Sequence, residues 1–87
     1  MISIGYKNYI LKERIVAVVL PDSRPIKNLI KGARENGRLI NATMGNKTKS
    51  VIITNSNHVI LSANAPETIV NRVNIAKKKS EIDHSKE

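Results

Sequence analysis

The fold is decided around residues 38–53, which read Arg38-Leu-Ile-Asn-Ala-Thr-Met-Gly-Asn-Lys-Thr-Lys-Ser-Val-Ile-Ile53. Two short apolar runs flank the pair Gly45-Asn46, and both residue types tolerate the positive φ that a two-residue hairpin turn requires. In this register Met44 lies opposite Lys47, because directly opposed residues share one face of a hairpin. The pattern therefore predicts two antiparallel strands joined at Gly45-Asn46.

Lys47 and Lys49 would lie on one face of the second strand, roughly 6.6 Å apart. No carboxylate occurs in residues 38–53 to neutralise them. We therefore expect a small anion-binding ridge, in which Lys47 and Lys49 contact phosphate groups and Asn46 shapes or assists the tip. The alternative interpretation is a charged hairpin tip that is only solvated.

The charge of the chain favours a polyanionic partner. In 87 residues there are 15 Lys and Arg against 7 Asp and Glu, a net charge of +8. Ten of the bases and three of the acids fall in residues 7–49, so +7 of the +8 lies there. Nucleic acid or an anionic membrane surface would suit this charge. With two Tyr and no Trp or Phe, the chain has few rings for stacking unpaired bases, so duplex backbone phosphates are the expected target.

Length and composition predict one small domain that associates with itself. A chain of 87 residues is marginal as a monomer, and without Cys it cannot be stabilised by disulfides or thiolate metal sites. No apolar run approaches the length of a membrane span, and the first residues do not resemble a signal peptide. We expect a cytoplasmic, nucleoid-associated homo-oligomer with no membrane partner.

Apolar patterning predicts an α+β domain with the element order β-β-β-α-β-β-β-α and a mostly antiparallel sheet. A short N-terminal hairpin is expected in residues 2–11, and a strand covered on both faces at 14–20. After the central hairpin, a turn at 55–57 leads to a strand at 58–62, so the last three strands would form a meander. This sheet has more apolar surface than two short helices cover, and a subunit interface is expected to bury the rest.

The first helix is marked by three local signals. Ser23 is a good N-cap, Pro25 suits the first turn, and Gly37 suits a left-handed end. Apolar side chains form one stripe along this helix, at Ile26, Leu29, Ile30 and Ala33. Basic side chains form a neighbouring stripe, which we interpret first as a solvated face, at Arg24, Lys27, Lys31 and Arg34.

The second helix is expected to begin with Asn64 as its cap and Glu67 in its first turn, and to bury Ile69, Val70 and Val73. Residues 1–76 would form the domain. Residues 77–87 are Lys-rich with almost nothing to bury, so they are expected to be a disordered tail.

Catalysis and metal binding have little support in the sequence. A set of Ser56, His58 and Asp22 can be imagined, but no elbow motif marks the serine. The only other histidine is His84, and there is no Cys and no glycine-rich phosphate loop. We therefore expect no enzyme activity, no metal, no cofactor and no small-molecule substrate.

One long block of the sequence resembles a known family. The block includes Ile4-Gly5, Asn8, Arg14-Ile15, residues 21–27 (Pro-Asp-Ser-Arg-Pro-Ile-Lys), Ala33-Arg34, Gly37, residues 39–43 with Gly45, residues 58–63 (His-Val-Ile-Leu-Ser-Ala) and residues 66–68 (Pro-Glu-Thr). Over residues 2–73 it resembles the RemA family of bacterial regulators of extracellular-matrix genes.

The resemblance implies a small cytoplasmic protein that assembles into closed rings, binds duplex DNA and regulates biofilm genes. The family's DNA-contacting positions are an arginine at the start of the long strand and an arginine pair after the hairpin glycine. They fall here on Arg14 and on Asn46-Lys47, and Lys49 follows where the family usually has another arginine. Lysine supplies charge but lacks the planar fork with which arginine grips phosphate.

The predicted DNA contacts are therefore Arg14, Asn46, Lys47 and Lys49, with a second rank of Lys7, Lys12, Arg24 and Arg38. For Arg14 the alternative is an edge charge that keeps the sheet soluble. For the whole protein the alternative is an RNA- or ribosome-associated module, because the same charge would serve it.

Overall fold

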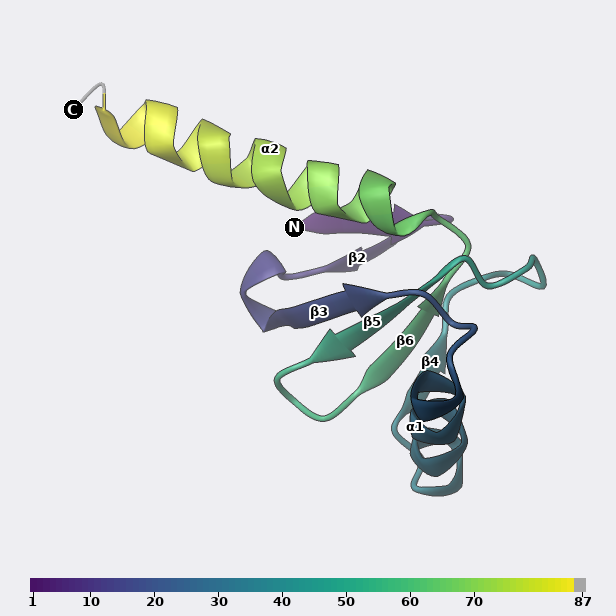
Figure 1. Cartoon of the computed structure of the whole chain (residues 1–87). Coiled ribbons are helices and arrows are strands. Elements are labelled where there is room, and N and C mark those ends of the chain that lie inside the picture. Colours follow the sequence, from purple (N-terminus) through teal and green to yellow (C-terminus); the bar gives the residue numbers. More distant parts are fainter. Residues whose placement is uncertain (86–87) are drawn as a thin grey trace.

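The structure, a computed structural model, describes the backbone of residues 1–85 and the side chains of residues 1–76. This part of the chain contains six strands and two helices. In chain order they are β1 (Ile2–Gly5), β2 (Asn8–Ile10), β3 (Ile15–Val19), α1 (Arg24–Glu35), β4 (Leu39–Asn41), β5 (Ser50–Thr54), β6 (Val59–Ser62) and α2 (Pro66–Ser85). A 3-10 turn (Lys12–Arg14) precedes β3. The α+β class and the succession of strands and helices along the chain are as predicted (Figure 1).

The strands form two sheets, whereas the sequence predicts one. β1 and β2 pair as an antiparallel hairpin, which confirms the prediction for the N-terminus. The other four strands lie in the order β3-β5-β6-β4. α2 packs on β1 and β3, whereas α1 lies beside β4 and β6 (Figure 1). The four-stranded sheet therefore has α1 on one side and the β1-β2 hairpin with α2 on the other.

The core lies on both faces of β5 and β6, which form the predicted hairpin around a turn at residues 55–57. Ile52 and Ile60 pack with Ile69 of α2 on one face, while Val51 and Leu61 pack toward α1 on the other. Successive residues of a strand point to opposite faces. Continuous apolar runs are therefore what a strand buried on both sides requires.

The predicted hairpin of residues 38–53 is wrong. β4 does not pair with β5 but runs parallel to β6, with Leu39 opposite Val59 and Asn41 opposite Leu61. Both edges of β5 are already occupied, one by β3 and the other by β6. β4 therefore takes the outer edge of β6, and the predicted three-stranded meander is wrong for the same reason.

β3 lies at an edge of the four-stranded sheet, and both of its faces are covered only in part, which corrects the prediction of a strand covered on both faces. None of its residues is buried, and Val16 is 64% exposed at an irregularity in the pairing between Ile15 and Ala17. Val16 is the extra residue at this irregularity, and such a residue is left unpaired in the strand ladder. The apolar run arises because Val18 packs against one core cluster and Val19 against the other.

α1 begins and ends where the sequence predicts. Ser23 Oγ accepts the backbone N–H of Ile26 at 3.4 Å, and Pro25 lies in the first turn. Gly37 has φ +70°, the left-handed conformation that commonly ends a helix. The apolar stripe faces the sheet, where Ala33 is buried.

α2 begins at Pro66 and not after an Asn64 cap. The side chain of Asn64 is occupied differently, because its Oδ1 accepts a hydrogen bond from Arg72 Nη1 at 2.9 Å. The same nitrogen donates to the carbonyl oxygen of Ser3 at 2.9 Å. These bonds tie the start of α2 to β1.

The apolar side chains of α2 are buried only in part as predicted. Ile69 is fully buried, but Val70 is 44% exposed and Val73 is half-buried. The helical backbone continues to Ser85, through most of the predicted tail. The predicted disordered tail is residues 77–87, and the side chains of these residues lie outside the described part of the chain.

Candidate nucleic-acid interface

The first group of predicted contacts lies on the loop of residues 42–49, which joins β4 to β5. The loop turns at Met44 and Gly45, with φ +51° and +81°, and the Asn46 N–H donates to the Thr43 carbonyl at 3.0 Å. Positive φ at both central residues is the pattern of a type I′ turn. The tight turn therefore comes one residue earlier than predicted and closes a loop instead of a two-stranded hairpin.

Asn46 ties this loop to the turn between β1 and β2. Its Nδ2 donates to Tyr6 Oη at 2.6 Å and to the Thr43 carbonyl at 3.1 Å. Tyr6 and Lys7 form the β1-β2 turn, both with positive φ. We call the turn of residues 6–7 together with the loop of residues 42–49 the loop end of the molecule.

The loop end carries three exposed lysines, Lys7, Lys47 and Lys49. Because Lys47 and Lys49 lie on a loop, the spacing of roughly 6.6 Å that a strand would impose does not apply. The fold also brings carboxylates nearby, since Asp22 and Glu67 line the same hollow as Lys47 and Lys49. The ridge that is free of acids in the sequence therefore has acidic neighbours in space.

Arg14 lies at the opposite end of β3, where the 3-10 turn leads into the strand. Its side chain is exposed, and its carbonyl accepts the backbone N–H of Asn55 at 2.9 Å. Lys12 belongs to the same 3-10 turn. We call Lys12 and Arg14, together with the turn of residues 55–57, the Arg14 end.

A single chain does not bring Arg14 together with Lys47 and Lys49. β3 and β5 run antiparallel between the two ends (Figure 1). The five extended residues of β3 span about 13 Å. The predicted DNA contacts therefore form two basic groups, separated by the length of a strand.

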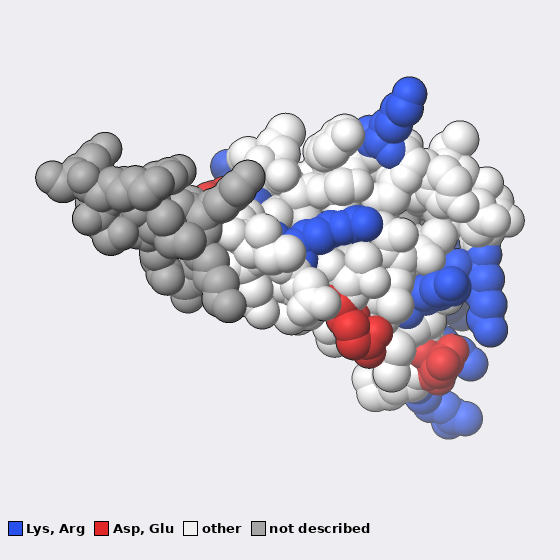
Figure 2. Space-filling model, turned by 90° about the horizontal axis from the view of Figure 1, so that it is seen from above, with Lys and Arg blue, Asp and Glu red and all other residues white. Residues whose placement is uncertain are grey.

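Charges of both signs share the surface seen in Figure 2. Lys and Arg side chains are scattered over this view and are densest on its right, where Asp and Glu side chains lie between them. This face has no single continuous cationic patch among the residues described. Contact with a polyanion there would depend on separate groups of cations.

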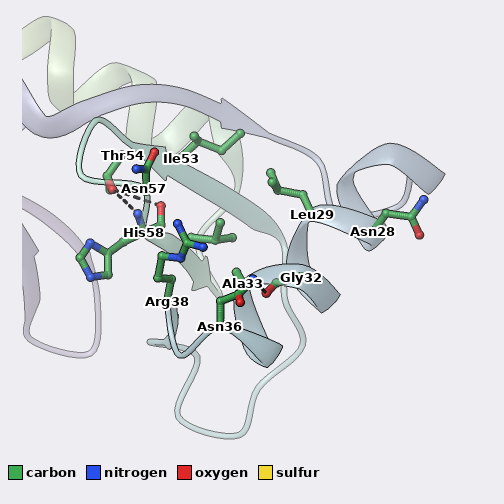
Figure 3. A pocket seen from close by; sticks show the side chains of 11 residues that line it. Asn28, Leu29, Gly32, Ala33, Asn36, Arg38, Ile53, Thr54, Asn57 and His58 are labelled. Atoms are coloured by element: carbon green, nitrogen blue, oxygen red, sulfur yellow. Dashed lines mark hydrogen bonds between the residues drawn. The ribbon is translucent and has the colours of Figure 1, made fainter.

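The remaining second-rank candidates lie on α1 and before β4. Arg24 is the exposed first residue of α1. Arg38 is also exposed and lines a hollow of about 340 Å³ between α1 and the β5-β6 turn (Figure 3). Asn57 and His58 of that turn line the same hollow, so Arg38 lies nearer to the Arg14 end.

His58 belongs to a hydrogen-bond network that shapes the β5-β6 turn. Ser56 Oγ lies 2.8 Å from His58 Nδ1 and 3.0 Å from Thr54 Oγ1. Asp22, the third member of the set imagined from the sequence, lines the hollow at the loop end instead. The three residues are therefore not brought together. Within the described residues, no cluster of His, Asp and Glu is suited to hold a metal ion.

Sequence reasoning missed Tyr6 and Met44 at the loop end. Tyr6 meets Asn46 across 40 residues of chain, and Met44 is 70% exposed at the turn. Gly45 predicts a turn because glycine tolerates positive φ, but the observed turn lies one residue earlier, at Met44 and Gly45. No local pattern announces a contact between two distant turns.

None of the helices in the described residues has the length and apolarity needed to cross a bilayer.

The family model described as "RemA-like: Extracellular matrix regulatory protein A-like" matches residues 1–73. This match confirms the resemblance noted for residues 2–73.

Relatives match along nearly the whole chain. A protein of Alkaliphilus metalliredigens, named "Putative regulatory protein", is 48% identical over 87 residues, covering 100% of this chain and 94% of the relative. A protein of Nostoc punctiforme, whose name also begins "Putative regulatory protein", is 49% identical over 84 residues, covering 97% of this chain and 96% of the relative. One from Geobacillus thermodenitrificans is 54% identical over 72 residues, covering 83% of each chain.

Proposed function

Because the chain belongs to the RemA-like family, we propose that it is a double-stranded DNA-binding regulator that works as a ring-shaped homo-oligomer. The names of its relatives support a regulatory role. In this proposal the protein acts in the cytoplasm on the nucleoid, controls genes of the extracellular-matrix or biofilm type, and has no catalytic activity.

The observation that carries the proposal is the exposure of cations at both ends of β3. Arg14 projects at one end, and Lys7, Lys47 and Lys49 project at the other. Exposed Lys and Arg contact phosphates, and each neutralised phosphate adds to affinity through the release of counterions. The net charge of +8 acts in the same direction by attracting the duplex.

Exposed apolar side chains support self-association. Val16 is 64% exposed, Leu20 60% and Ile40 46%, and these residues lie on or beside the two edge strands of the sheet. β5 and β6, which the sequence suggests are too apolar to be covered by one chain, are already buried. The apolar surface left for a neighbouring copy therefore lies at the sheet edges.

Competition binding tests this function. Labelled duplex DNA is bound, and unlabelled duplex DNA or structured RNA is added while fluorescence anisotropy is recorded. We expect duplex DNA to displace the probe at lower concentration than RNA. Displacement by RNA at lower concentration would favour the RNA- or ribosome-associated module.

A charge-matched pair of variants makes the same assay specific for the interface. Lys47→Ala and Lys27→Ala each remove one exposed lysine, the first from the loop end and the second from the basic stripe of α1. We expect Lys47→Ala to weaken duplex binding more than Lys27→Ala does. Equal losses would mean that only the net charge matters.

A further inference from the structure

The hollow between α1 and the β5-β6 turn has the make-up of a small-molecule site. It encloses about 340 Å³ and has an apolar lining formed by Leu29, Ala33, Ile53 and Val59. Arg38 also lines it, whereas no Asp or Glu of the described residues does. Ligand pockets of this size combine apolar walls with a few well-placed polar groups. The hollow therefore suits an apolar molecule that carries a negative charge.

Arg38 holds its cation at this hollow without a partner. Its backbone is fixed on both sides, because its N–H donates to the Ala33 carbonyl at 2.8 Å and its carbonyl accepts the Val59 N–H at 3.0 Å. Its guanidinium group points toward the β5-β6 turn (Figure 3). Among the described residues, nothing forms a hydrogen bond or an ion pair with this group. All five of its N–H donors are therefore open to a ligand.

A row of small polar residues on α1 forms the facing wall. Asn28, Gly32 and Asn36 follow one another at intervals of four residues, so they share one face of the helix, and all three line the hollow. Asn36 Nδ2 donates to the Gly32 carbonyl at 2.8 Å. Carboxamides supply both donors and acceptors, so the wall can orient a polar substituent of a ligand.

Gly32 keeps the centre of this row open, and the described part of the chain gives no reason for a glycine there. Glycine inside a helix lowers its stability relative to alanine. Gly32 has no positive φ, and no described atom beyond its own stretch of helix lies within 4 Å of the place where a Cβ would stand. Neither the backbone conformation nor close packing requires glycine. A ligand that approaches the helix backbone closely would require it.

We propose that this hollow binds a small organic monoanion, an apolar body of about ten to fifteen non-hydrogen atoms that carries one carboxylate. Arg38 would hold the carboxylate through two parallel hydrogen bonds. The body would lie against Leu29, Ile53 and Val59 and cover Gly32. A single negative charge suits the site because Arg38 is the one Lys or Arg among the described lining residues, and the His58 ring points away from α1 (Figure 3).

Occupancy of the hollow would also act on the Arg14 end, a consequence that rests on the proposed function. Asn57 lines the hollow, and Asn55 of the same turn donates its backbone N–H to the Arg14 carbonyl at 2.9 Å. A bound carboxylate would neutralise Arg38, which is a second-rank duplex contact. Saturating ligand should therefore lower duplex affinity, by about threefold if one phosphate contact is lost.

Titration with 2-naphthoate tests the site on the full chain in its native assembly. The chain has no Trp, so naphthalene fluorescence anisotropy can be followed without a tryptophan background. We expect saturable binding to one site per chain. The neutral 2-naphthamide has the same body and should bind about tenfold more weakly, because the charge-assisted hydrogen bonds are lost. The dianionic 2-naphthyl phosphate should bind no more tightly than 2-naphthoate.

Arg38→Ala and Arg34→Ala form a matched pair, because each removes an exposed arginine and only Arg38 lines the hollow. Arg38→Ala should weaken 2-naphthoate binding by about tenfold or more, and Arg34→Ala should leave it unchanged. Equal affinities of the two variants would show that net charge alone attracts the probe and would overturn the site.

Gly32→Ala tests the placement of the apolar body. No described atom stands in the way of the added methyl group, so the variant should fold and should unfold at a slightly higher temperature. Binding of 2-naphthoate should weaken by about tenfold, because the methyl group takes space that the body needs. The control Lys31→Ala changes the preceding exposed residue, which does not line the hollow, and should leave binding unchanged. Unchanged affinity in Gly32→Ala would overturn the placement.

The outcomes separate this inference from the proposed function. A chain that binds duplex DNA but shows no saturable binding of 2-naphthoate at millimolar concentration would overturn the ligand site alone. A chain that binds 2-naphthoate with the predicted effects of Arg38→Ala and Gly32→Ala, but does not bind duplex DNA, would support the ligand site and overturn the proposed function. Duplex affinity that stays the same at saturating 2-naphthoate would overturn the action on the Arg14 end.

Discussion

The two basic ends of the molecule are built in different ways. At the Arg14 end, the backbone continues the pairing of β3 with β5, and the Arg14 carbonyl accepts the N–H of Asn55. At the loop end, Ala42 and Lys49 donate their backbone N–H groups to the Leu61 and Ser62 carbonyls of β6. The shape of residues 43–48 between them depends on positive φ and on the side-chain bonds of Asn46. A charge can therefore be removed from the Arg14 end without touching what holds its backbone, whereas the loop end owes its shape to its own side chains.

The largest effect is expected at the Arg14 end. Arg14→Ala should weaken duplex binding by about tenfold or more, because the loss repeats in every copy, while the free energy of unfolding changes by less than about 0.5 kcal/mol. Anisotropy and chemical denaturation measure the two quantities. Assembly should persist, because the substitution leaves the exposed apolar side chains of the sheet edges unchanged.

Arg14→Lys is the matched variant for this prediction. Partial recovery of binding, which we expect, would show that charge carries most of the contact. No recovery would show that the guanidinium fork is needed. Loss of the oligomer in Arg14→Ala would identify Arg14 as an interface residue and contradict its assignment to DNA.

A smaller effect, of opposite sign, is expected from Lys47→Arg at the loop end. Arginine can hold a phosphate with two parallel hydrogen bonds, so duplex affinity should rise by about two- to fivefold. The measurement is a titration beside the unchanged protein at the same salt concentration. An unchanged affinity for both Lys47→Arg and Lys47→Ala would remove Lys47 from the interface.

Asn46→Ala should destabilise the loop end by about 1 kcal/mol, because two hydrogen bonds of its Nδ2 are lost. Tyr6→Phe removes the hydroxyl partner alone and should cost less. Asn55→Ala is the counterpart at the Arg14 end, where the side-chain bond to the Glu13 carbonyl is long, at 3.4 Å. Denaturation that shows Asn55→Ala to be as costly as Asn46→Ala would break the contrast between the ends.

The smallest effect is expected from relief of backbone strain in the turn. Met44→Gly should raise the free energy of unfolding by about 0.5 kcal/mol, because glycine adopts φ +51° without a Cβ clash but gains freedom in the unfolded chain. Asn57→Gly, at φ +65° in the β5-β6 turn, should gain less, because asparagine tolerates this region. Thermal unfolding at concentrations too low for assembly compares the two variants.

The sequence was sufficient where signals are local. Ser23, Pro25 and Gly37 mark both ends of α1 within a few residues, and two apolar runs around residues 55–57 mark the β5-β6 hairpin. Local signals could not predict which strand β4 pairs with. A hairpin with β5 and a parallel pairing with β6 suit the same residues, and the choice depends on which strand edges remain open.

The sequence could predict which basic residues are candidate contacts, but not how the fold arranges them in space. The sequence shows that residues 38–53 lack acids, but folding brings Asp22 and Glu67 beside Lys47 and Lys49. It also places Arg14 a strand's length away from both lysines. Proximity in space between distant residues leaves no trace in spacing along the chain.

The salt dependence of duplex affinity shows whether the cations at both ends of β3 contact phosphates. The logarithm of the association constant is measured against the logarithm of salt concentration for the unchanged protein and for the Arg14→Ala, Lys47→Ala and Lys27→Ala variants. We expect a steep linear fall for the unchanged protein, with a slope reduced by about 0.9 for each phosphate contact that Arg14→Ala or Lys47→Ala removes, and unchanged in Lys27→Ala. Slopes that are the same in all four proteins would show that Arg14 and Lys47 do not contact phosphates.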